Sequence, residues 1–119
     1  MKDSSVYLVI IGFSVMGLGA LVRPVLVTAQ FGILDLTPAG RNEIRAVYGG
    51  FGILVAVALL VALRQPVLRD GILFTVAAAL AGMAAGRAAS VAIDRTIDRL
   101  PLCYLVLEVF GAVMLGVAA

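Results

Sequence analysis

Apolar residues form four long stretches along the chain, and short polar segments separate them. The stretches are Val6–Val22, Ala46–Leu63, Gly71–Ile93 and Leu102–Ala119. Each stretch approaches the ~20 residues that a helix needs to cross a hydrocarbon layer of ~30 Å. Lipid offers no hydrogen-bond partner to backbone N–H and C=O groups, so an open chain crosses it only as helices. The pattern therefore predicts an all-α membrane protein with four transmembrane helices.

Turn residues indicate where the predicted helices begin and end. Thr37 before Pro38 is typical of an N-cap followed by proline at the first helical position, and Asp70 is a suitable N-cap for the third helix. We expect helices at about residues 5–31, 39–64, 70–94 and 101–118. Because the connections are short, successive helices should run antiparallel. Residues 1–119 are thus predicted to form a single antiparallel four-helix transmembrane domain.

The first apolar stretch allows more than one interpretation. Arg23-Pro24 marks either the membrane interface or a kink, so residues 25–36 either prolong the helix or lie along the membrane surface. Lys2 followed by an apolar run and Gly17–Ala20 also resembles a secretory signal peptide. The basic segment before the apolar run is weak, so we expect this helix to be retained as a span.

Composition excludes several classes of protein. Hydrophobic residues make up 63% of the chain and charged residues 13%, whereas a soluble domain is about half apolar and about a quarter charged. The net charge of +2 comes from scattered basic residues, which argues against nucleic-acid binding. The chain has no histidine and one cysteine, Cys103, so zinc sites and an intrachain disulfide are excluded. We expect no metal, no cofactor and no nucleic-acid partner.

Two ionisable residues, Arg87 and Glu108, interrupt the apolar spans. Each costs roughly 2.5–3.5 kcal/mol at the bilayer centre, so both should face protein or water. Arg87 lies seven residues before Asp94, and Glu108 lies seven residues after Pro101. At about 1.5 Å per helical residue, both charges lie roughly 10 Å from the same membrane face. Equal depth, opposite sign and neighbouring helices predict an ion pair between them.

The first turns of the second helix add polar groups at the same membrane face. Asn42, Arg45 and Gly49 lie on one helical stripe with Tyr48 beside it. The long side chain of Arg45 can approach the predicted ion pair, and Gly49 and Gly50 leave space for a helix or a ligand. The predicted polar cluster, which is either a ligand pocket or a buried structural group, comprises Asn42, Arg45, Tyr48, Arg87 and Glu108.

Small residues recur at helical spacing and predict close helix contacts. In the third span Ala78, Gly82, Gly86 and Ser90 are each four residues apart. Such a stripe lets helix backbones approach, either inside the bundle or across a homodimer seam. The predicted helix-packing positions are Gly49, Gly50, Gly82, Gly86 and Ser90.

The polar motif also resembles a known family. The run from Asn42 to Gly50 (Asn-x-x-Arg-Ala-x-Tyr-Gly-Gly), followed by Gly86-Arg87 and a lone Glu108, is similar to a bacterial family of four-span membrane proteins. That family is catalogued as a domain of unknown function. The resemblance covers nearly the whole chain, and Arg-Ala-x-Tyr-Gly-Gly is its most specific part. It implies a multi-pass protein of the bacterial inner (cytoplasmic) membrane and no known reaction.

The sequence leaves several functions open. A buried Arg–Glu pair most simply fixes helix register and orientation. Two arginines and a tyrosine at one end also suit binding or transport of an anionic or amphipathic small molecule or lipid. Small-residue stripes suit an accessory subunit of a larger membrane complex. We expect membrane lipids and a homodimer or partner membrane protein as partners, and no enzyme, because no nucleophile–base pair is present. The count of basic residues favours cytoplasmic odd-numbered loops, but Arg45 belongs to the predicted polar cluster and acidic residues share that side, so the orientation of the termini stays open.

Overall fold

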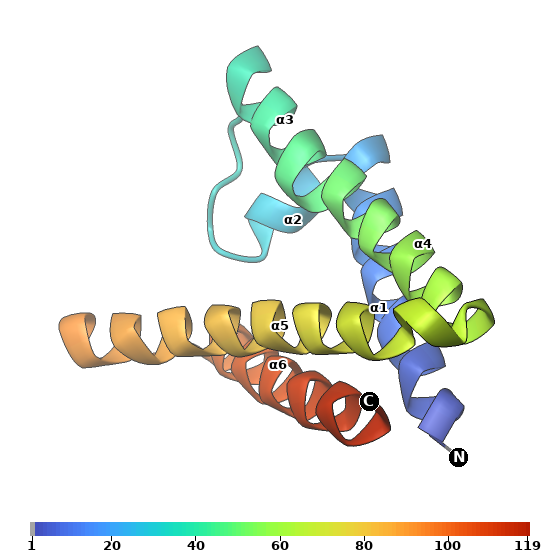
Figure 1. Ribbon diagram of the computed structural model, residues 1–119. Helices are drawn as coiled ribbons and strands as arrows, with labels where there is room; N and C mark the ends of the chain where they lie inside the picture. The colour runs from blue at the N-terminus through green and yellow to red at the C-terminus, as the bar shows by residue number, and fades with distance from the viewer. Residues whose placement is uncertain (1) are drawn as a thin grey trace. The chain divides into compact units, whose positions relative to one another are not determined.

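The computed structural model describes residues 2–119 as a series of helices without strands (Figure 1). A π-helix, η1, follows directly on α3 and continues directly into α4, so these three elements form one unbroken helical segment. The elements are α1 (Lys2–Val22), α2 (Val25–Ala29), α3 (Pro38–Ile44), η1 (Arg45–Gly50), α4 (Phe51–Arg64), α5 (Pro66–Asp94) and α6 (Arg99–Ala118).

Four helical segments have the length and apolarity that a membrane span requires. They are Asp3–Val22, Pro38–Arg64, Pro66–Asp94 and Arg99–Ala118, and the shortest contain 20 residues. At about 1.5 Å per residue these reach about 30 Å, the thickness of a bilayer hydrocarbon core. Only 17% to 33% of the most apolar part of each span is buried inside the chain, so most of this apolar part is left for contact with an apolar environment such as lipid. The chain is a multi-pass membrane protein, and the predicted all-α fold with four spanning helices is confirmed.

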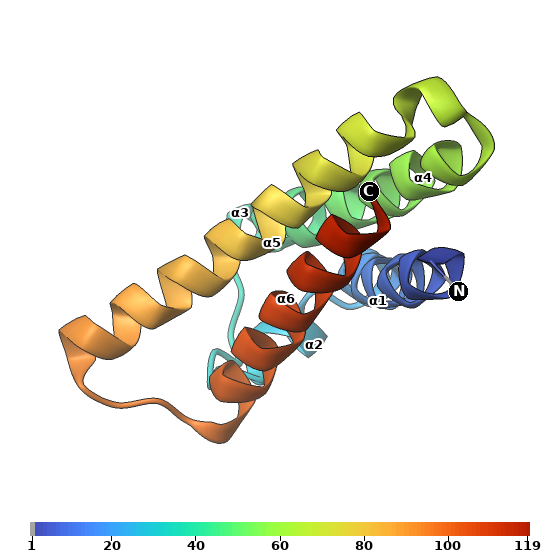
Figure 2. The ribbon, with the colours of Figure 1, turned by 60° about the horizontal axis from the view of Figure 1, so that its bottom comes forward.

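Internal contacts divide the helices into two units. One unit contains Val61–Ala119 together with the start of the chain up to Val6, and the other contains Tyr7–Leu60. In the first unit α5 and α6 run antiparallel and pack along each other, with a short connection between them (Figure 2). In the second unit α1 packs against η1 and the start of α4.

The helix predicted over residues 5–31 is divided in the structure. α1 ends at Val22, and Pro24 follows it. Proline has no N–H to continue the helical hydrogen-bond ladder, and its ring obstructs the preceding turn. α2 therefore forms a separate short helix, and residues 30–37 return to the start of the next span.

Proline sets the starts of the second and third spans. Thr37 is an N-cap, as predicted, because its Oγ1 accepts a hydrogen bond from the Gly40 N–H at 3.0 Å. The third span begins at Pro66, not at residue 70, after Gln65 adopts an extended conformation with φ −120° and ψ 93°. Since proline at the first position already has a helical φ, it starts the helix early. Asp70 therefore lies inside α5 and does not cap it.

Glycines allow α1 to approach η1 and α4 closely. A Cβ atom at Gly17 would lie 2.9 Å from the Gly49 carbonyl oxygen, and one at Gly52 would lie 3.1 Å from the Phe13 carbonyl oxygen. Side chains larger than glycine would push these helices apart. In lipid, where water does not drive helices together, such close backbone packing holds the pair.

Replacing Gly17 with alanine should lower the melting temperature of the purified protein in detergent, because the new methyl group would crowd the Gly49 carbonyl oxygen. Overpacking of this kind costs about 1–3 kcal/mol. Gly12→Ala is the matched control on the same helix, since a Cβ there meets no atom within 4 Å. It should be neutral or stabilising, because alanine favours helix by about 0.8–1.0 kcal/mol over glycine. Equal melting temperatures for the two variants would show that Gly17 does not hold α1 in place.

Candidate functional site

The first unit contains an ion pair between neighbouring helices. Arg87 lies on α5 and Glu108 on α6, and the Arg87 Nε donates to Glu108 Oε1 at 2.9 Å and to Oε2 at 2.8 Å. The Glu108 side chain is 6% exposed and the Arg87 side chain 26% exposed. The ion pair predicted from the sequence is thus present, with the carboxylate covered and the guanidinium partly open.

Tyr104 completes this group from the same helix as the acid. The Arg87 guanidinium carbon lies 5.4 Å from the centroid of the Tyr104 ring, within range of a cation–π contact. Tyr104 and Glu108 are four residues apart, so they lie on one face of α6 and meet Arg87 together. Sequence reasoning missed Tyr104, although its spacing from Glu108 was the available signal.

The geometry of this group favours charge neutralisation over proton transfer. Both carboxylate oxygens of Glu108 accept from the same guanidinium N–H, and arginine keeps its proton in proteins. Removing one partner of such a buried pair typically costs about 3–5 kcal/mol, because the other charge is left uncompensated. Loss of either Arg87 or Glu108 is therefore expected to leave an uncompensated charge at the contact between α5 and α6.

The second unit contains a separate polar contact at the end of α1. The Arg45 Nε donates to the Leu21 carbonyl oxygen at 3.1 Å. Leu21 lies in the last turn of α1, where carbonyl groups have no partner within the helix. Arg45 therefore connects the start of η1 to the end of α1. Tyr48 is half-buried and Asn42 is exposed.

The π-helix η1 spans Arg45–Gly50, the same run on which the family resemblance mainly rests. π-Helical turns are rare and occur frequently at functional sites. Gly49 is buried, and a Cβ there would lie 2.8 Å from the Leu21 side chain. At Gly50 the nearest atom would be the Arg45 carbonyl oxygen at 3.8 Å. Gly49 is therefore the packing glycine of this pair, and Gly50 has room.

Comparison with known proteins identifies the family. A family model for a domain of unknown function, DUF4345, matches residues 4–119. The chain belongs to the DUF4345 family. No curated protein and no solved structure matches it. The predicted membership in a domain-of-unknown-function family is confirmed.

The predicted polar cluster of the DUF4345 chain divides between the two units. Arg87 and Glu108 meet in the first unit, whereas Asn42, Arg45 and Tyr48 belong to α3 and η1 in the second. The structure establishes the ion pair and the Arg45 contact with α1 separately. The convergence of all five residues in one pocket stays a prediction.

The small-residue stripe of the third span lies outside the contact between α5 and α6. Gly82, Gly86 and Ser90 are exposed, and a Cβ atom at either glycine would meet no atom within 4 Å. Their predicted role in helix packing stays untested. Among the predicted packing positions, the close contact is made by Gly49.

Arg69 forms a polar contact that sequence reasoning missed. Its Nη2 lies 3.0 Å from Asp3 Oδ1 and donates to the Ala118 carbonyl oxygen at 3.4 Å. One side chain near the start of α5 thus bonds to the start of α1 and to the end of α6. Arg69 lies in the turn between the helices predicted at about 39–64 and 70–94, and no local pattern indicates contacts with residues so distant along the chain.

Replacing Glu108 with glutamine should destabilise the DUF4345 protein in detergent, because Arg87 would keep a charge without its counter-ion. The expected loss is about 3–5 kcal/mol. Met114→Leu on the same helix is the control, since this swap nearly conserves volume and typically costs under about 1.5 kcal/mol. Thermal unfolding of both variants measures the difference, and equal losses would contradict a buried, interdependent pair.

Proposed function

We propose that this DUF4345 protein is a membrane-embedded structural protein whose α5–α6 hairpin is fixed by the Arg87–Glu108 pair. The observation that supports this role is the double acceptance by Glu108, at 2.8 and 2.9 Å, from one guanidinium N–H. Tyr104 lies against the cation from the same side. Three polar side chains thus define how the two helices meet.

The Arg87–Glu108 pair favours one register of α5 against α6 over the registers shifted by a turn. Sliding one helix by a single turn would move its charge about 5.4 Å along the axis and separate the two ions. Each ion would then face apolar surroundings, at a cost of several kcal/mol. Apolar side chains such as Leu and Val give no comparable penalty, since they pack in several registers. This contrast supports a role in specifying geometry.

The resemblance to a bacterial family supports placement in the bacterial inner membrane. The four apolar spans require a bilayer, and most of their surface suits lipid contact. Separation of inner and outer membranes on a sucrose gradient, followed by immunodetection of the chain, tests this placement. Recovery in the outer-membrane fraction would contradict it.

Binding or transport of an anionic or amphipathic molecule is the second candidate function, and η1 is the observation that favours it. Arg45 lies at the start of this π-helix with an exposed side chain. Its Nε is engaged by the Leu21 carbonyl oxygen, while its terminal nitrogens make no hydrogen bond to another residue within 2–119. Those nitrogens are suitable donors to a carboxylate or phosphate.

Exchanging the two charges tests the register role. Arg87→Glu alone and Glu108→Arg alone each place like charges together, so amide hydrogen exchange should accelerate in α5 and α6. The double variant restores opposite charges and should recover part of the protection that each single variant loses. Hydrogen-exchange mass spectrometry measures each helix separately.

The second unit provides the internal control for this exchange experiment. Peptides from residues 7–22 of α1 and from η1 should change less than those from α5 and α6, because the pair lies within the first unit. If the amides of the double variant exchanged as fast as those of the faster-exchanging single variant, the two side chains would not determine the register.

A further inference from the structure

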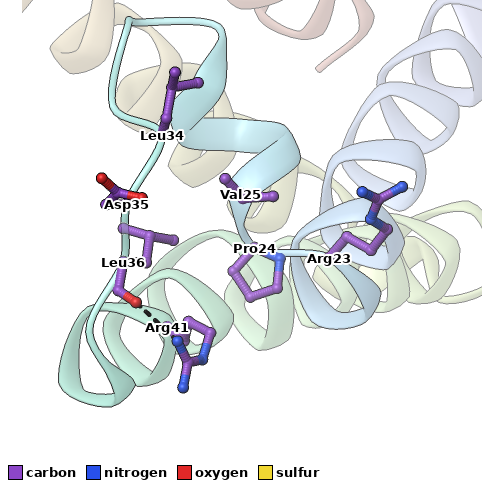
Figure 3. A pocket seen from close by; sticks show the side chains of 7 residues that line it. All are labelled: Arg23, Pro24, Val25, Leu34, Asp35, Leu36 and Arg41. Carbon is purple, nitrogen blue, oxygen red and sulfur yellow. Dashed lines mark hydrogen bonds between the residues drawn. The ribbon is translucent and has the colours of Figure 1, made fainter.

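A cavity of about 340 Å³ lies in the second unit, beside the loop that returns from α1 to α3 (Figure 3). This volume is in the range of small-molecule sites, about 300–1,000 Å³. Its lining combines positive, negative and apolar groups, among them Arg23, Arg41, Asp35, Val25, Leu34 and Leu36.

The cavity lies at the level where a bilayer changes from hydrocarbon to headgroups. The first span ends at Val22, and Arg23 is the next residue. The second span begins at Pro38, so Arg41 lies within its first turn. A helix of 20 residues extends about 30 Å and already crosses the hydrocarbon core. Both arginines are therefore placed near the depth of the lipid phosphates.

Apolar side chains are exposed along the loop that borders the cavity. Leu26 is 47% exposed, Phe31 40% and Leu34 68%. At a membrane interface, such side chains enter the boundary between headgroups and acyl chains. The second of the two interpretations offered by the sequence, a segment along the membrane surface, accounts for this exposure. The loop thus places a lipid-compatible surface beside two cations.

The two arginines differ in how they are held. The Arg41 Nη1 donates to the Leu36 carbonyl oxygen at 2.8 Å, which orients its side chain at the cavity wall (Figure 3). Within residues 2–119 the Arg23 side chain makes no ion pair and no hydrogen bond. The lining carries a formal charge of +1, because Asp35 offsets one of the arginines. A single phosphodiester would balance that charge.

We propose that this cavity binds the phosphate of a membrane phospholipid. The Arg23 guanidinium, which has no other partner within residues 2–119, donates to the phosphate oxygens, while Arg41, whose guanidinium points away from that of Arg23 (Figure 3), adds positive charge at the cavity wall. The acyl chains lie along the exposed apolar side chains of residues 25–36. Asp35 opposes binding of a group with a second negative charge. This site belongs to the second unit and does not depend on the role proposed for the Arg87–Glu108 pair in the first.

Native mass spectrometry of the full chain in detergent, titrated with phosphatidylglycerol, tests the proposal. Arg23→Gln should weaken lipid binding by about tenfold or more, the loss expected for one charge-assisted hydrogen bond. Arg64→Gln is the matched control, because it removes the same charge from an exposed residue outside the cavity. Equal lipid binding by the two variants would overturn the proposal.

Further arms of the same titration identify the bound group. Inorganic phosphate should bind far more weakly than the phospholipid, and equal affinity would overturn the lipid assignment. Asp35→Asn should strengthen binding of phosphatidylglycerol by removing a like charge from the cavity, and weaker binding would contradict the role given to Asp35. If Arg45→Gln lost lipid binding and Arg23→Gln retained it, the proposed lipid site in the cavity would be overturned and a lipid site at η1 would be favoured.

A folding control keeps the result interpretable. The Arg23 side chain has no polar contact within the described residues, so Arg23→Gln should melt within about 3 °C of the wild type without added lipid. Added phosphatidylglycerol should raise the melting temperature of the wild type more than that of Arg23→Gln. An equal rise in both proteins would also overturn the proposal.

Discussion

The inability of a bilayer to solvate ions and backbone carbonyls is the constraint on which this structure depends. Arg87 and Glu108 form a buried ion pair, because each charge alone would be costly next to lipid. The same rule explains two other arginines, since Arg45 and Arg69 each donate to a carbonyl oxygen at the end of a helix. Arginine suits both tasks because it carries several donors on a long side chain. The few polar side chains of these spans thus lie where lipid offers neither a hydrogen-bond partner nor a counter-ion.

The two units satisfy this constraint with different chemistry. In the first, α5 and α6 meet through an ion pair and an aromatic ring. In the second, α1 meets η1 and α4 through glycines that bring backbones together, with Arg45 at the helix end. Ionic contacts are specific in register and costly to break, whereas glycine contacts depend on shape and are spoiled by a single methyl group. The π-turn occurs in the glycine-packed unit and ends at Gly49 and Gly50.

Much of the fold could be predicted because lipid simplifies the sequence pattern. Long apolar stretches gave the four spans, and opposite charges at matched depth gave the Arg87–Glu108 pair. The start of the third span was misplaced because Asp70 suggested a cap while Pro66 provides the actual start. The contacts of Arg69 and the cavity beside Arg23 depend on the paths of turns between helices. No local pattern specifies those paths, so these features required the structure.

The length of α5 has a consequence for how it lies in a membrane. Charged residues bracket its apolar part at Asp70 and Asp94, and the intervening turns extend roughly 36 Å. This exceeds a typical hydrocarbon thickness of about 30 Å. Hydrophobic mismatch of this size is relieved by inclination of the helix axis or by local thickening of the lipid. A thicker bilayer would therefore let α5 stand more upright, which makes its angle a function of the surrounding lipid.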